Sequence, residues 1–206
     1  VEVAKKAPSI DRIVVSTDSE EVATIAKAAG AEVPFLRPAT LADDTSKVAD
    51  AVAHLLLRLK ADEQYRPDYI LLLQPTNPMR TVEDIEKSIA LIQSRKADSL
   101  VSVCKVTEPL LLTKDADDTL TFVHGELFTS TNRQELPQHY RLDGCMIFLV
   151  NTEKFLEQRS FYAGKCIGYE IEKWRAVDID APEDFVVGEM LFDKQQRIAE
   201  AINHFS

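Results

Sequence analysis

The chain has 206 residues, of which 45% are hydrophobic and 28% are charged, so a single soluble globular domain is expected. A formal net charge of −10 argues against a nucleic-acid-binding surface, and no apolar run approaches the roughly 18 to 20 residues that span a bilayer. The three cysteines show no metal or redox spacing, and the first residues do not resemble a signal peptide. These properties predict a cytoplasmic protein with no nucleic-acid or membrane partner.

Strand and helix patterns alternate along the chain. The first helix is expected to be capped by Asp18 or Ser19 and to stop at Gly30, and Thr81 with Asp84 forms a capping pair for a later helix. In chain order, the predicted elements are a strand at 11–16, helices at 20–29 and 47–60, a strand at 70–73, a helix at 82–95, strands at 98–106, 144–150 and 166–171, a short strand end at 177–180, and a long helix at 182–203.

This alternation predicts an α/β fold with a doubly wound, mostly parallel sheet and helices on both faces. The apolar run at 70–73 has no polar side, which indicates a strand that is covered on both faces. Residues 107–141 change character, with short alternating stretches and turn signals. They are expected to form a β-rich excursion within a single domain of residues 1–206.

Asp178 and Asp180, in "VDIDAPEDF", form the first candidate site. In an extended segment, residues at i and i+2 point to the same side with Cα atoms about 6.5 Å apart, so two carboxylates can converge on one hard cation such as Mg²⁺. The alternative is that Asp178 is solvated and that Asp180 only caps the helix that follows.

A stiff polar loop follows the apolar strand at 70–73 and forms the second candidate site. Pro75 and Pro78 each fix their own φ and restrict the residue before them, so the loop would hold Gln74 at the carboxyl end of a strand. Open α/β sheets place their ligands at such ends. Arg80 could bind a phosphate or pair with a helix acid. The simpler interpretation is a rigid turn without a ligand.

Two further groups are weaker candidates. Asp18 begins a helix, where free N–H groups favour an anion, although a plain capping role is the commoner outcome. Arg133 and Arg141 lie in the irregular stretch before a strand, and two arginines there could grip a carboxylate or phosphate or could simply be solvated.

Four stretches, in this order, resemble the acylneuraminate cytidylyltransferases, the CMP-sialic acid synthetase family and its relatives that act on bacterial nonulosonic acids. The resemblance covers almost the whole chain and is carried by "IVVSTDSEEVATIAKAAGAEVPFLRPATLADDTS", "LLLQPTNPMRT", "NRQELPQHYRLDGCMIF" and "VDIDAPEDF". It implies a fold like that of nucleotide-diphospho-sugar transferases. It also implies an enzyme in which the anomeric hydroxyl of the sugar attacks the α-phosphate of CTP, pyrophosphate leaves, and Mg²⁺ neutralises charge on the phosphates.

The resemblance implies roles for the residues of the first two candidate sites. Asp178 and Asp180 match the pair that holds the metal, and Gln74 matches a glutamine that contacts the acceptor sugar. On this interpretation, the two prolines of the loop hold Gln74 at the floor of a sugar pocket.

Further roles are implied for basic and nucleotide-binding residues. Arg37 matches an arginine beside the cytosine pocket, where backbone groups near Ser46 would read the base edge. Arg133 and Arg141 match arginines near the sugar and phosphates. The excursion at 107–141 would swap across a homodimer, so that Arg133 would serve the site of the neighbouring subunit.

Other functions stay open. Family members begin with a strand and a basic loop that wraps the triphosphate, and this chain starts after them, so a catalytically inactive, dimer-forming homologue or fragment is one alternative. Another is the related 3-deoxy-manno-octulosonate cytidylyltransferase, which shares the fold and the reaction. The stretches "LLLQPTNPMR" and "NRQELP" favour the sialate type.

Overall fold

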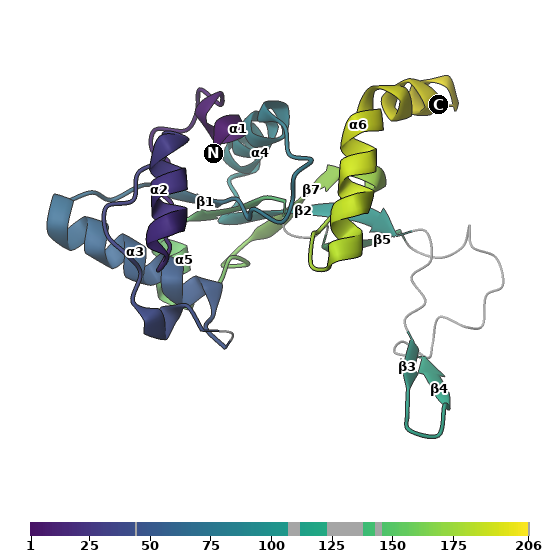
Figure 1. The fold of residues 1–206 in the computed structure, drawn as a ribbon, viewed down its shortest axis with the longest axis horizontal. Coiled ribbons are helices and arrows are strands. Elements are labelled where there is room, and N and C mark those ends of the chain that lie inside the picture. The colour runs from purple at the N-terminus through teal and green to yellow at the C-terminus, as the bar shows by residue number, and fades with distance from the viewer. Residues whose placement is uncertain (44, 107–111, 123–137, 143–145, 206) are drawn as a thin grey trace.

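The computed structural model describes residues 1–43, 45–106, 112–122, 138–142 and 146–205 (Figure 1). The helices are α1 (Glu2–Lys5), α2 (Glu20–Ala28), α3 (Val48–Glu63), α4 (Val82–Arg95), α5 (Thr152–Gln158) and α6 (Pro182–Phe205), with short 3₁₀ turns η1 (Ala39–Leu41) and η4 (Lys173–Arg175). The strands are β1 (Tyr69–Leu72), β2 (Ser99–Val106), β3 (Leu112–Lys114), β4 (Leu120–Phe122), β5 (His139–Leu142), β6 (Phe148–Asn151) and β7 (Cys166–Ile171).

The main sheet is mixed. β1 and β2 run in the same direction with β6 between them, antiparallel to both. β5 pairs antiparallel with the second half of β2, and β7 pairs in parallel with β2 from Ser99 to Cys104. The mostly parallel arrangement expected from the sequence is therefore not confirmed. β1 and β2 are joined through α4, the crossover that strands of the same direction need, but β5 and β6 enter the sheet in the opposite direction.

Both faces of the sheet are covered (Figure 1). On one face, the strands pack against α4 and Leu191 of α6, and on the other against α3 and α5. β1 divides between the two, because Leu71 packs on the first face and Ile70 and Leu72 on the second. This explains why the run at 70–73 carries no polar side chain.

The predicted strand at 11–16 is reduced to one parallel bridge between Val14 and Glu32. Val15 N donates to Glu32 O and Glu32 N donates to Ile13 O, both at 2.9 Å. Ile13 and Val15 also pack against the apolar cluster that contains Ala23 of α2. The segment is thus held by packing and one bridge instead of a ladder of hydrogen bonds.

The stretch at 107–141 divides into two described parts. β3 and β4 pair antiparallel as a separate two-stranded sheet, as the β-rich pattern predicted. β5 instead belongs to the main sheet, with His139 opposite Val106 and Arg141 opposite Cys104. The remainder of the stretch lies outside the described residues, so its role in a dimer and the single-domain assignment stay predictions.

The predicted helix ends agree well with the structure. Ser19 caps α2 by accepting from Val22 N, and Gly30 follows this helix with a φ of 92°. Thr81 and Asp84 form the capping box of α4. The predicted strand end at 177–180 is absent, because those residues form no ladder. None of the described helices combines the length and apolar character that a bilayer crossing requires.

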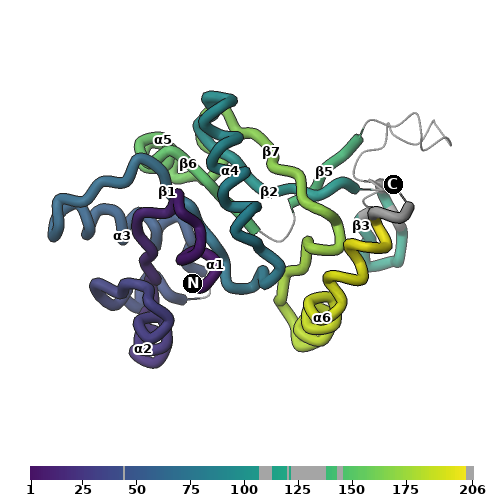
Figure 2. Tube along the Cα trace, turned by 90° about the horizontal axis from the view of Figure 1, so that it is seen from above, coloured from purple at the N-terminus to yellow at the C-terminus, as the bar shows by residue number. Residues whose placement is uncertain are grey.

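The two helices that begin near the candidate residues lie far apart in the fold. Figures 1 and 2 both place α2, which follows Asp18, and α6, which follows Asp180, toward opposite ends of the molecule. α4 lies between them in both views. The candidate residues therefore belong to two groups, one on each side of α4.

Candidate active site

The loop that follows β1 is held in place by Arg80. Arg80 Nε donates to Met146 O at 2.7 Å, and Nη2 donates to Gln74 O at 3.0 Å. Asn77 and Met79, between the two ends of the loop, are buried. These contacts give Arg80 a structural role, and the phosphate contact or helix-acid pair considered from the sequence stays a prediction. They also fix the backbone of Gln74 at the carboxyl end of β1.

The segment with the two aspartates lies against this loop. Ile179 N donates to Thr76 O at 2.9 Å. Ile179 stands between Asp178 and Asp180, and Thr76 lies two residues after Gln74. One backbone hydrogen bond therefore brings the glutamine turn and the aspartate pair, which are far apart in the sequence, to one place in the fold.

The two aspartates differ in their surroundings. Asp178 is half-buried, and its Oδ1 is buried with no hydrogen-bond partner among the described residues. Such an atom is costly to bury unless a ligand or an ion completes its coordination. Asp180 is exposed, and its backbone N and that of Ala181 donate to Asp184 Oδ2 at 3.1 and 2.9 Å. The carboxylate of Asp184, in the first turn of α6, therefore holds the backbone just before the helix, and no described hydrogen bond runs from a helix amide to the Asp180 side chain, so the predicted cap at Asp180 is not seen.

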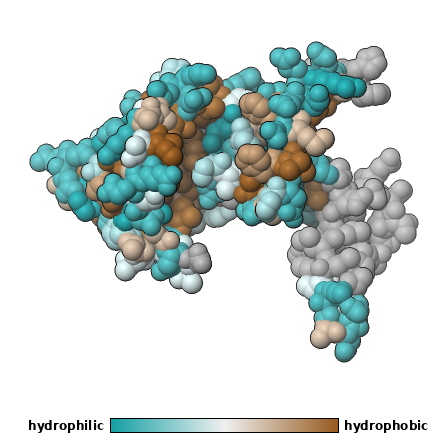
Figure 3. Space-filling view, in the orientation of Figure 1, coloured by the Kyte–Doolittle hydropathy of each residue, from teal (hydrophilic) through white to brown (hydrophobic). Residues whose placement is uncertain are grey.

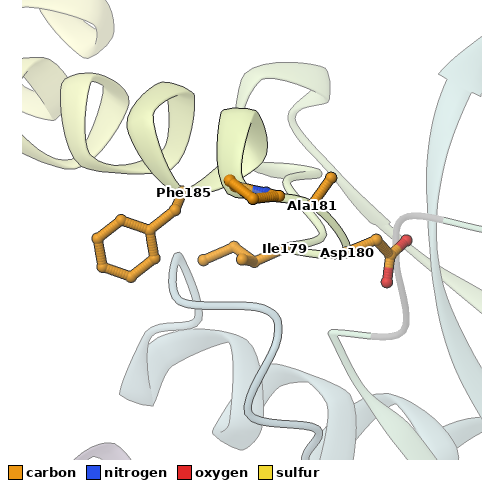
Figure 4. Close-up of a pocket in the computed structure, with 5 residues that line it drawn as sticks. Ile179, Asp180, Ala181 and Phe185 are labelled. Carbon is orange, nitrogen blue, oxygen red and sulfur yellow. The ribbon is translucent and has the colours of Figure 1, made fainter.

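An open hollow of about 430 Å³ lies at this point, within the size range of small-molecule sites. It is lined by Ile179, Asp180, Ala181, Pro182 and Phe185. Figure 4 shows Phe185 and Ile179 extending to one side and the Asp180 carboxylate pointing to the other. The hollow is thus mostly apolar, with one carboxylate at its edge.

The residues present fit a magnesium ion better than a metal held by protein ligands alone. Among the described residues, no three His, Cys, Asp or Glu side chains gather into a metal site. Mg²⁺ is usually held by one or two carboxylates, together with substrate phosphates and water. Asp178, whose Oδ1 has no partner among the residues that the structure describes, and Asp180, with its exposed carboxylate, meet that requirement.

A buried ion pair lies next to the aspartate segment. Arg175, in η4, donates through Nη2 to Asp84 Oδ2 and to Met79 O, the latter at 3.2 Å, and through Nη1 to Glu172 at 2.9 Å. Tyr169 OH donates to Asp84 Oδ1 at 3.2 Å. The side chains of Arg175 and Asp84 are 12% and 4% exposed. The sequence pattern revealed only the capping role of Asp84, because its other partners come from distant parts of the chain.

This environment changes the acidity of Asp84. Burial alone would raise its pKa, but hydrogen bonds from Arg175 and Thr81 and the charge of Arg175 outweigh burial and hold the pKa below its usual value. A lowered folded-state pKa means that the carboxylate contributes fully to stability above its unfolded-state pKa of about 3.9. The contribution is lost as the pH falls through the lower folded-state value.

We therefore expect the free energy of unfolding of the wild type to exceed that of Asp84→Asn by a steady margin between about pH 7 and pH 5. Below about pH 4 the margin should shrink, because the wild-type carboxylate becomes protonated. Urea unfolding of both proteins at a series of pH values measures this difference. A margin that stays the same down to about pH 2 would contradict the ion pair.

Arg37, Asp18 and Ser46 form a second group, beside α2. Arg37 Nη2 lies 3.6 Å from Asp18 Oδ1, and Arg37 Nε is buried without a partner among the described residues. Hydroxyl groups of Thr45 and Ser46 donate to Asp43 Oδ1 at 2.8 and 2.9 Å and lower the pKa of that carboxyl. Arg37 thus forms an ion pair with Asp18, and the Ser46 side chain stabilises a local turn through Asp43.

The two arginines of the irregular stretch are placed differently. Arg141 lies in β5 and is exposed, and no described contact joins it to Asp178 or Asp180. Arg133 lies outside the described residues. Their roles beside the sugar and phosphates stay predictions.

Comparison with known proteins identifies the family. The chain matches the family model described as Cytidylyltransferase over residues 1–201. The chain therefore belongs to the cytidylyltransferase family, whose members are nucleotidyltransferases. This confirms the resemblance found in the sequence.

Individual relatives agree with this assignment. The chain is 33% identical to the CMP-N,N'-diacetyllegionaminic acid synthase of Legionella pneumophila over 189 residues, which are 90% of this chain and 80% of that protein. It is 29% identical to an N-acylneuraminate cytidylyltransferase of Escherichia coli over 199 residues, which are 96% of this chain but 46% of that protein. The chain thus spans less than half the length of the second relative.

A solved structure shows the same fold. It is that of CMP:2-keto-3-deoxy-manno-octonic acid synthetase complexed with CTP, and it matches with a TM-score of 0.61 and 14% sequence identity. The match covers 93% of this chain and 86% of the other. The likeness establishes the α/β fold shared by these enzymes.

Proposed function

We propose that the protein is a cytidylyltransferase that activates a nonulosonic acid of the sialic acid type with CTP and releases pyrophosphate. The observation that carries this proposal is the hydrogen bond from Ile179 N to Thr76 O at 2.9 Å. In a chain of the cytidylyltransferase family, it sets the aspartate segment against the turn that carries Gln74.

The residues of the aspartate segment and of the loop are proposed to have different roles. Asp178 and Asp180 would hold a magnesium ion, which when bound neutralises negative charge on the phosphates. Gln74, whose backbone is fixed by Arg80, presents an amide that can both donate to and accept from the hydroxyl groups of a sugar. The apolar wall formed by Ile179 and Phe185 would exclude water from one side of the hollow.

The nucleotide is assigned to the second group of residues. Arg37 Nε is a buried donor without a described partner, which suits a ligand oxygen. Asp18 orients the same guanidinium at 3.6 Å. Backbone groups near Ser46 would read the edge of the cytosine, and Arg133 and Arg141 would lie near the sugar and phosphates.

The acceptor is proposed to be an acidic sugar of the sialic acid type. Support comes from the two curated relatives, which are named for N,N'-diacetyllegionaminic acid and N-acylneuraminate. The likeness to the CMP:2-keto-3-deoxy-manno-octonic acid synthetase rests on the fold alone and does not favour that sugar.

We also propose a cytoplasmic homodimer. The space-filling view shows apolar residues at the surface over α6 (Figure 3). Large side chains on this helix are between half and two thirds exposed, namely Phe185, Val186, Val187, Met190 and Phe192. A second subunit would remove this apolar surface from water. The exposed free thiol of Cys166 suits a reducing compartment.

The proposal is tested by a pyrophosphate-release assay on the full-length protein with CTP, Mg²⁺ and a panel of nonulosonic acids. We expect turnover that requires both CTP and Mg²⁺ and is highest with a sugar of the sialic or legionaminic type. The same assay with 3-deoxy-manno-octulosonate serves as the control for the acceptor. Turnover with that sugar alone would reassign the acceptor, and no release of pyrophosphate with any sugar would favour the inactive homologue.

A further inference from the structure

We infer that Arg175 and Asp84 are a positioning pair that sets Asp178 at the correct place beside the glutamine turn. This inference rests on the proposed function, because it assumes that Asp178 holds the metal. Neither side chain belongs to the set of residues that contact the substrates in that proposal.

The aspartate segment is attached to the loop after β1 at two points. Arg175 Nη2 donates to Met79 O at 3.2 Å, and Ile179 N donates to Thr76 O at 2.9 Å. Asp178 lies between these two attachments and has none of its own among the described contacts. Its position is therefore set by the residues on either side of it.

The attachment through Arg175 depends on Asp84. A guanidinium has five donors in a fixed plane, and here they reach Asp84, Met79 and Glu172 together. Asp84 is the most buried member, and Tyr169 and Thr81 hold its carboxylate from other directions. The orientation of Arg175 is thus fixed by the first turn of α4 and by β7, which pairs with β2.

Arg175 and Asp84 take no direct part in the proposed reaction. The Arg175 side chain is 12% exposed, and its described partners are protein groups. An interaction of this kind is expected to act on metal affinity through the ligand that it positions. Mutation of such supporting residues typically costs about 10- to 100-fold in metal affinity.

Arg175→Lys tests the inference, because lysine keeps the charge but cannot make the three contacts at once. Mn²⁺ serves as the probe. Its affinity for the full-length protein, with a non-hydrolysable CTP analogue present, is measured by electron paramagnetic resonance, and the Mg²⁺ concentration for half-maximal pyrophosphate release is measured in parallel. In the variant, we expect the Mn²⁺ affinity to fall and the half-maximal Mg²⁺ concentration to rise, each by about tenfold or more.

Arg12→Lys is the matched control. Arg12 is also a largely buried arginine, 16% exposed, that pairs with two carboxylates, Glu32 and Glu63. This variant should lose stability while its Mn²⁺ affinity stays within about twofold of the wild type. Should Arg175→Lys fail to fold by circular dichroism, Tyr169→Phe, which removes one hydrogen bond to Asp84, takes its place with an expected weakening of about two- to fivefold.

The outcomes separate this inference from the proposed function. Unchanged Mn²⁺ affinity in a folded Arg175→Lys protein, with weakened affinity in Asp178→Asn, would overturn the positioning role and leave the metal assignment intact. An equal loss of Mn²⁺ affinity in Arg175→Lys and Arg12→Lys would mean that the effect comes from a general loss of stability. That result would also overturn the positioning role of Arg175. Unchanged affinity in Asp178→Asn would overturn the metal assignment and this inference together.

Discussion

Replacing Asp178 or Asp180 by asparagine is expected to reduce Mg²⁺-dependent pyrophosphate release by more than about 100-fold. Asparagine has nearly the shape of aspartate but carries no charge, so the packing is kept while the attraction to a divalent cation is lost. Several kcal/mol of charge stabilisation are at stake in a metal-assisted step. Initial rates at saturating CTP, measured across a range of Mg²⁺ concentrations, give the size of the loss.

The two variants should differ in stability. Asp178 Oδ1 is buried and has no partner within the described part of the chain, so its neutral replacement should raise the melting temperature or leave it unchanged in the absence of Mg²⁺. Asp180 is exposed, and its replacement should have almost no effect on stability. Asp193→Asn, at an exposed position of α6, is the matched control and should keep full activity. Full activity in both site variants would remove the metal assignment.

Replacing Asp84 by alanine should lower the free energy of unfolding by about 3–5 kcal/mol, because it leaves the charge of Arg175 buried without its partner. The same change removes the acceptor for Thr81 N and opens the capping box of α4. Urea unfolding at neutral pH measures the loss. A change below about 1 kcal/mol would show that the pair is solvated in solution.

Glu83→Ala is the control for this experiment. Glu83 lies in the same turn of α4 as Asp84, but its side chain is 72% exposed and, among the described residues, its ion pair is with Lys87. Its removal should cost no more than about 0.5 kcal/mol, the usual value of an exposed pair four residues apart on a helix. The contrast between neighbouring acidic residues isolates the effect of burial.

Local patterns were sufficient to predict most helices and their ends. The caps at Ser19 and at Thr81 with Asp84 were found because each involves residues only three apart in the sequence. α6 was predicted at 182–203 and observed as Pro182–Phe205. α5 was missed, since seven residues make too short a pattern to distinguish from a loop.

Features that depend on contacts between distant residues could not be predicted from local patterns. The direction of β5 and β6 depends on how they meet β2, and no periodicity in a single strand records its direction. The partners of Asp84 lie in η4 and β7, so its spacing to Thr81 gave no sign of them. The cap predicted at Asp180 is not seen, because α6 begins at Pro182 and the carboxylate of Asp184 instead accepts from the two amides just before the helix.

The site residues were predicted in part. Spacing and loop chemistry led to Gln74, Asp178 and Asp180, and the family resemblance implied their roles. The fold brings their two segments together through Thr76 and Ile179. The supporting residues behind them, Arg80 and Arg175 above all, were recognised only from their contacts. A side chain that donates to carbonyl oxygens has no fixed sequence signature, because every residue offers such an oxygen.

The double attachment of the aspartate segment restricts how this region can be engineered. Arg175 and Ile179 are only four residues apart in the sequence, and each is hydrogen-bonded to the loop after β1. An inserted or deleted residue between them would break one of the two hydrogen bonds or would displace the carboxylates of Asp178 and Asp180. Residues 175–179 are therefore better altered by single substitutions than by insertions, deletions or grafted loops.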